Sequence, residues 1–145
     1  MKPELKSVML AGALLLTFEM FAMFATAQIT NEITFETAFP FYVGNAKVPA
    51  GSYRVTPVQE STRLLRIEDA TGSHSAYLEF VPTHADSPHP QTDITFTNYG
   101  QVDFLNQLWI QGQTYGMQML PGKAEEIAAK NGTVKRHSVP GKSGG

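Results

Sequence analysis

The sequence predicts an all-β protein: a single antiparallel meander, closed as a sandwich or a small barrel, with one short helix near the C-terminus. Two observations lead to this prediction. Apolar and polar residues alternate in short runs, which is the period of a strand with one buried face. Turn-forming residues separate these runs at intervals of about 8–12 residues, a spacing typical of antiparallel sandwiches and barrels.

Three strands are expected in the first half of the chain. Residues 33–43 place Ile, Phe and Val at odd positions, so one face is apolar, and Pro40 indicates an edge or a bulge. A Gly-Asn turn and a Pro-Ala-Gly segment then lead into a second strand, residues 52–58. Residues 63–69 form the third, with Leu and Ile at alternate positions.

Four further strands are expected after the next glycine turn, over residues 73–81, 92–99, 102–111 and 114–120. Residues 92–99 alternate best, and their Thr and aromatic residues are favoured in strands. Residues 82–90 contain three prolines, so we expect an exposed loop there.

Residues 123–130 carry the helix signals. Acidic residues occupy the first turn, Lys the last, and Asn-Gly follows. A helix this short is unstable alone, so it must either pack through Ile127 or fray. The β domain is therefore expected over residues 28–132. Residues 133–145 are rich in Gly and Ser and carry basic residues, so we predict a disordered basic tail there.

The N-terminal residues 1–27 are predicted to be a cleaved signal peptide. Two lysines precede an apolar run at residues 8–18, and Ala-Thr-Ala at 25–27 has the small–x–small pattern of signal peptidase sites. Glu19 lies within the apolar stretch and disfavours a retained membrane anchor. We expect a mature chain that begins at Gln28, has no transmembrane span, and is exported to the periplasm or the cell exterior.

Composition excludes several classes of protein. The 145 residues have the length of one domain, and nine Phe, five Tyr and one Trp argue against disorder. The net charge of −2 excludes a strongly basic nucleic-acid binder, so no nucleic acid is expected as a partner. Cysteine is absent from the sequence, which excludes disulfides, thiolate metal sites and thiol nucleophiles.

Two segments, residues 39–44 (FPFYVG) and 48–55 (VPAGSYRV), resemble a family of small exported proteins of soil bacteria. Its theme is F-x-V-G…P-A-G-x-Y-x-V after a signal peptide, and most members are labelled hypothetical. The resemblance covers most of residues 33–130. It implies an exported β domain and supplies no catalytic residues.

A weak metal site is suggested by three residues on the proline-rich loop: His84, Asp86 and His89. Imidazole and carboxylate groups bind zinc and copper, but three ligands on a loop fall short of a closed site, so no cofactor is expected.

Signals for catalysis are poor. In Ser73-His74-Ser75 the serines and the histidine alternate on a strand, so they point to opposite faces and cannot hydrogen-bond as a triad. The sequence has no phosphate-binding glycine loop. Its carboxylates alternate with apolar residues, as on a solvated sheet face. We expect a protein that is not an enzyme.

Four large residues are out of phase with the expected core residues of their strands: Tyr42, Tyr77, Leu105 and Trp109. If Phe104 and Leu108 face the core, Leu105 and Trp109 face outward. Either the helix or a second layer covers them, or they form a contact surface for a partner, a glycan or another copy.

These observations favour an exported, non-catalytic binding or structural protein of the cell envelope whose partner the sequence does not identify. Two alternatives remain: a barrel that binds a small ligand, and a surface subunit that self-associates through a sheet edge.

Overall fold

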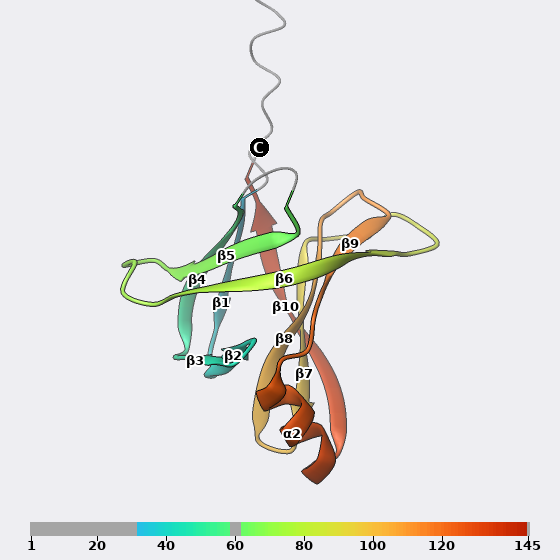
Figure 1. Cartoon of the computed structure of the whole chain (residues 1–145). Helices are drawn as coiled ribbons and strands as arrows, with labels where there is room; N and C mark the ends of the chain where they lie inside the picture. Colours follow the sequence, from blue (N-terminus) through green and yellow to red (C-terminus); the bar gives the residue numbers. More distant parts are fainter. Residues whose placement is uncertain (1–31, 59–61, 145) are drawn as a thin grey trace, which may run out of the picture. The chain divides into compact units, whose positions relative to one another are not determined.

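The computed structural model describes residues 32–58 and 62–144, which form ten strands and one helix (Figure 1). The predicted signal peptide, residues 1–27, and Gln28 lie outside the described residues. The elements are β1 (Ile33–Thr37), β2 (Phe41–Val43), β3 (Ala46–Val48), β4 (Gly51–Pro57), β5 (Leu64–Asp69), β6 (Ser75–His84), β7 (Asp93–Tyr99), β8 (Val102–Trp109), β9 (Tyr115–Met119), α2 (Lys123–Asn131) and β10 (Val134–Ser143).

Eight strands close an antiparallel barrel in the order β1–β4–β5–β6–β9–β8–β7–β10, and β10 pairs with β1. Strands β4, β5 and β6 follow one another along the chain, and β7, β8 and β9 form a second meander whose last strand pairs with β6. The predicted all-β fold with one short C-terminal helix is confirmed, and the sheet closes as a barrel. Closure pairs strand edges that would otherwise be open to other chains.

Two long strands, β6 and β10, join the two halves of the barrel. The first half of β6 pairs with β5 and its second half with β9. Likewise, β10 pairs with β7 up to Pro140 and with β1 from Gly141 onward. Pro140 therefore lies where β10 changes partner, a position that tolerates a residue without an N–H group.

The prediction of a disordered tail over residues 133–145 is wrong, because β10 occupies most of this segment and the β domain extends beyond residue 132. The N–H and C=O groups of β7 and β1 need partners, and β10 supplies them whatever its side chains are. The sequence signal is weak because most β10 side chains are exposed. Gly141 lies where β10 meets the core: a Cβ there would overlap Ile94 Cδ1 and lie 3.1 Å from the Thr34 carbonyl oxygen, so a larger residue would require Ile94 to shift.

Inward-facing side chains from both halves of the barrel form one core. In β4 and β5 the buried residues alternate with exposed or half-buried ones, which is the pattern that predicted these strands. In β7 the alternation holds up to Phe96, and the next residue, Thr97, is also buried. The largest fully buried side chains are Phe41, Phe96, Ile33, Leu65, Ile67, Ile94, Leu108, Val43 and Val55.

The hairpin β2–β3 fills one end of the barrel. The ring of Phe41 packs edge-on against Tyr53 and Phe96, with centroid distances of 5.0 Å and 5.2 Å. The single strand expected over residues 33–43 is therefore divided, because the chain leaves the sheet between β1 and β2, where Pro40 lies.

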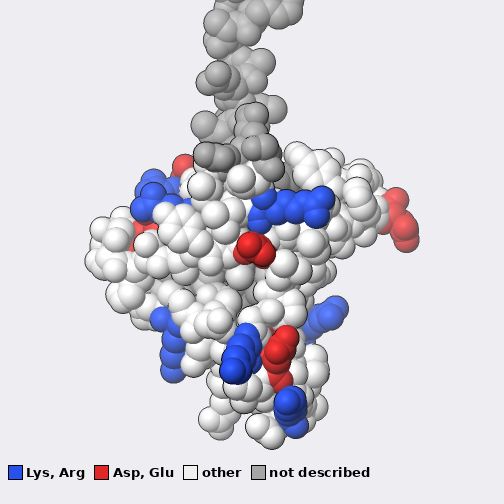
Figure 2. Space-filling model, viewed as in Figure 1, with Lys and Arg blue, Asp and Glu red and all other residues white. Residues whose placement is uncertain are grey.

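The predicted helix is confirmed, but it does not pack through Ile127, whose side chain is 53% exposed. Two hydrogen bonds attach α2: the Ala124 N–H donates to Asn45 Oδ1 (3.0 Å), and the Tyr99 hydroxyl donates to Glu125 Oε1 (3.2 Å). Basic side chains lie on and beside the helix (Figure 2). No helix within residues 32–58 and 62–144 is long and apolar enough to cross a bilayer.

Candidate functional site

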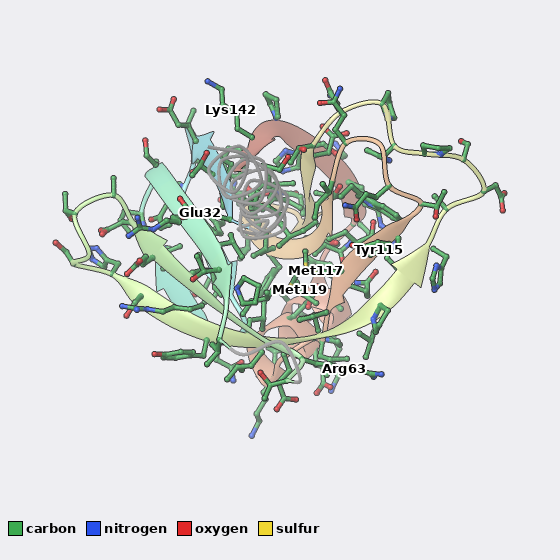
Figure 3. The ribbon with its side chains drawn as sticks, turned by 90° about the horizontal axis from the view of Figure 1, so that it is seen from above. Glu32, Arg63, Tyr115, Met117, Met119 and Lys142 are labelled. Atoms are coloured by element: carbon green, nitrogen blue, oxygen red, sulfur yellow. The ribbon has the colours of Figure 1, made fainter. Side chains whose placement is uncertain are left out.

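An apolar cavity of about 320 Å³ opens at the end of the barrel opposite the β2–β3 hairpin. Its deepest lining residues, Ile33, Val55 and Leu65, are buried core residues from β1, β4 and β5. Figure 3 looks onto this end: Met117 lies within the ring of strands, and Tyr115 lies to one side. The cavity is therefore a gap above the packed core of the barrel.

The walls of the cavity come from β6, β9 and the residue that follows β8, and its rim comes from strand ends. Phe80, Ile110 and Met117 are half-buried and pack against the core, so they form the walls. Tyr115, 49% exposed, lies at the rim, as does the exposed Pro57 at the end of β4. The cavity is open at its rim because β4 ends and β9 begins there. If these strands were longer, their side chains would fill the space.

Gly116 allows β9 to close this part of the wall. A Cβ at this position would lie 2.7 Å from Trp109 Cε3 and 2.8 Å from the Leu108 carbonyl oxygen. A glycine therefore lets β9 lie close to β8, while the indole of Trp109 covers the backbone at Gly116. Gly116 is also one of the residues that line the cavity.

The chemistry of the cavity favours an uncharged ligand. None of the described residues that line it carries a charge, and their polar side chains are the hydroxyls of Thr62 and Tyr115. A charged group placed there would lose its hydration without an ionic partner in this lining. The arrangement can therefore hold a small, mostly apolar molecule with a polar group at the rim.

A larger groove of about 660 Å³ runs over β1, β4 and β10, and its lining differs in kind. It includes the exposed side chains of Glu36, Arg54 and Lys142. Arg54 is already paired with Glu68 (2.7 Å), and Glu36 accepts a hydrogen bond from Ser52. This groove is a solvated strand surface with mixed charges, so the apolar cavity is the better candidate for a binding site.

The structure does not assemble the weak metal site. His84 and Asp86 are exposed, whereas His89 is half-buried and its Nε2 lies 2.9 Å from Asp93 Oδ2. The His89 ring also stacks on Trp109, at a centroid distance of 5.1 Å. Among the residues that the structure describes, no group of three metal-binding side chains is arranged to hold an ion.

The prediction that Leu105 faces outward is wrong, because it is a core residue with 3% exposure. A bulge causes the error: Thr95 pairs with Gln107 and Phe96 with Leu105, so Asn106 is an extra residue that reverses the alternation of β8. The bulged Asn106 is buried, and its Oδ1 accepts a hydrogen bond from Gln118 Nε2 (2.6 Å).

The other three residues of the expected contact surface do not lie together. Tyr42 stacks on Phe104 near the start of β8, at a centroid distance of 4.9 Å. Trp109 lies at the other end of β8, half-buried between His89 and Gly116. Tyr77 is on β6 and is 59% exposed. The four residues therefore do not form one surface.

The sequence predicted the inward direction of several cavity residues but did not predict the cavity itself. Ile110 and Phe80 fall on expected apolar faces, but the sequence does not show that space remains above them. Tyr115 and Met117 alternate with small or polar residues on the last expected strand, and this was the available signal. This alternation indicates that Tyr115 and Met117 share one face of the strand. It does not reveal the pairing of β9 with β6, which places both residues at the cavity.

Comparison with known proteins finds no match: no family model, no curated protein and no solved structure is similar to the chain.

Proposed function

We propose that this chain is an exported, non-catalytic binding protein that holds a small, uncharged, mostly apolar molecule in the open end of its barrel. The cavity is the observation that carries the proposal. Its volume of about 320 Å³ lies at the lower end of the range for small-molecule sites. Its floor is apolar and buried, so a ligand of matching chemistry would replace poorly solvated surface.

Export rests on the sequence. The charged start, the apolar run and the small–x–small pattern of residues 1–27 support it, as does the family resemblance of residues 39–44 and 48–55. The absence of charged groups from the described cavity lining supports a binding role over catalysis, since acid–base chemistry needs titratable side chains. A structural role in the envelope and self-association are the competing proposals.

Probe binding tests the proposal. We expect the purified protein to bind the neutral apolar dye N-phenylnaphthylamine, measured as a rise in dye fluorescence. Ile110→Trp and Met117→Trp fill the cavity and should weaken binding at least about tenfold, the effect of losing about 1.4 kcal/mol of contact. Tyr77→Trp adds the same indole to the outer face of β6 and is the matched control, expected to bind as the wild type does.

Native mass spectrometry completes the test. A monomer that retains a small apolar molecule after purification supports the proposal. Wild-type protein that binds neither the dye nor a co-purified molecule would overturn it, as would cavity-filled variants that bind the dye unchanged. A ladder of multimers without bound ligand would favour the self-associating subunit instead.

A further inference from the structure

The end of the barrel that carries α2 has a basic face with exposed apolar residues in it. We define this basic face as Lys123, Ile127, Lys130, Val134 and Arg136. In α2, the residues Lys123, Ile127 and Lys130 have i, i+4 and i+7 spacing, so they form one stripe along the helix. All three are exposed, whereas Ala124, Glu125 and Ala128 on the opposite side are half-buried against the barrel. The stripe is thus turned away from the protein.

The outer face of β10 continues this stripe. Val134 and Arg136 are exposed and lie two residues apart on one side of the strand, and Val134 pairs with Tyr99. Tyr99 in turn donates a hydrogen bond to Glu125 of α2. Arg136 pairs with Thr97, two residues before Tyr99 on β7. Burial raises the pKa of Tyr99, and the charge of Arg136 opposes that rise. Helix and strand therefore contribute to one surface.

Charge is distributed unevenly along the chain. Residues 123–136 contain four Lys/Arg and two Asp/Glu, and one of those two, Glu125, is half-buried. The described residues before Lys123 contain four Lys/Arg and eight Asp/Glu. Figure 2 shows Lys and Arg side chains on and around α2 with an acidic side chain among them, and Glu126 is the exposed acidic residue of the helix. The segment that forms α2 and the start of β10 thus has a net positive charge, and the described chain before it has a net negative charge.

We propose that the basic face docks on a bilayer surface that contains anionic phospholipid. Two exposed apolar side chains, Ile127 (53%) and Val134 (57%), lie among cationic ones. At a membrane interface such apolar groups enter the headgroup region while Lys and Arg remain with the lipid phosphates. Each Lys or Arg near an anionic surface strengthens binding by about fivefold.

Nucleic acid fits this face less well. Single strands are bound through stacked aromatic rings, and the rings of this end are engaged within the protein: Tyr42 stacks on Phe104, and Tyr99 lies edge-on to Phe104. The docking geometry also has a consequence for the cavity. Because α2 and the cavity lie at opposite ends of the barrel, the cavity of the docked protein opens away from the bilayer.

Vesicle sedimentation tests the proposal. We expect the purified protein to pellet with phosphatidylcholine vesicles that contain about 30 mol% phosphatidylglycerol, and to stay in solution with phosphatidylcholine alone. Binding should fall in about 0.5 M salt, which screens charge beyond a few ångströms. Lys123→Glu with Lys130→Glu should weaken binding at least about 25-fold, from two fivefold steps. Ile127→Gln should weaken it without changing the melting temperature, because the side chain is exposed in the folded protein.

The matched control is Arg63→Glu with Lys142→Glu, which makes the same change in net charge away from the basic face. Binding unchanged in this variant supports the assignment to the basic face. Equal loss in the control and the helix variant would overturn it, because net charge alone would then explain binding. Failure of the wild-type protein to pellet with anionic vesicles would also overturn it. If that protein instead binds a single-stranded RNA oligonucleotide, and the helix variant does not, the basic face is a nucleic-acid site.

Discussion

Gly116 and Trp109 form a cross-strand pair in which a large ring requires a residue without a side chain. In Gly116→Ala the new methyl group would meet both the indole and the Leu108 carbonyl oxygen below 3 Å, and the carbonyl belongs to the backbone. We expect a loss of about 1–3 kcal/mol in the free energy of unfolding, measured with urea, and a shift in Trp109 emission. At Gly144 the nearest atom would lie 3.6 Å from the added Cβ, so Gly144→Ala is the control, expected to stay within about 0.5 kcal/mol of wild type. Equal stability of the two variants would contradict the packing described for Trp109.

Asp69 organises the turn between β5 and β6. Its Oδ2 lies 2.9 Å from His74 Nδ1, and its Oδ1 accepts hydrogen bonds from Ser73 N–H (2.8 Å) and the Thr71 hydroxyl (3.1 Å). The hydrogen bond with His74, followed by those from the turn, lowers the pKa of Asp69 from 3.8 to about 2.

The lowered pKa makes the turn sensitive to acid. Ionised Asp69 makes its full contribution to the free energy of unfolding above the pKa that this group has in the unfolded chain. This contribution is lost as the pH falls from about 4 to about 2. We expect carboxyl NMR titration to report the low value, and His74→Ala to raise it toward 3.8. Asp69→Asn should speed amide exchange in the turn at neutral pH and remove its acid dependence. Asp86→Asn, a similar change at an exposed residue, is the control. An unchanged Asp69 pKa in His74→Ala would contradict this account.

The strand β10 decides whether the barrel closes. Seven residue pairs join it to β7 and three join it to β1, so its removal would expose two strand edges and the core between them. Truncation after Thr133 should abolish the cooperative unfolding transition and near-ultraviolet circular dichroism. Truncation after Ser143 removes only the end that follows β10 and should leave both unchanged. A folded, cooperative protein that ends at Thr133 would show that β10 is dispensable.

Regular strands were predictable from this sequence because each hides one face. Tyr53 and Val55, or Leu65 and Ile67, alternate with exposed or half-buried residues, and the local pattern contains the necessary information. β10 has no such pattern, since its stability comes from the edges of β7 and β1, which are far away in the sequence.

Two further features depend on information that a local pattern lacks. The Asn106 bulge changes the phase of β8, and one inserted residue leaves no periodic signal. The cavity depends on which strand ends meet. Ile33 and Met117 are separated by most of the chain, so the alternation of each strand places its residue inward without showing that the two share a space.

Ligand binding should stabilise the barrel strands more than the helix α2. A ligand that binds only the folded state raises the free energy of unfolding, by about 2.7 kcal/mol at a hundred times its dissociation constant. The floor of the cavity belongs to the same core that holds β1, β4 and β5 together. Amides of these strands exchange through global unfolding, so saturating ligand should slow their hydrogen exchange by up to about 100-fold.

The helix should not share this protection. No residue of α2 is buried, and its attachments described above are two hydrogen bonds, so it can open while the barrel stays closed. We expect its amides to exchange at the same rate with and without N-phenylnaphthylamine. Ile110→Trp, which fills the cavity, should remove the ligand effect from β1, β4 and β5 and leave α2 as it is. Equal protection of helix and strands would show that α2 opens only when the barrel unfolds. Strand exchange unaffected by ligand would mean that the ligand does not bind in the core-lined cavity.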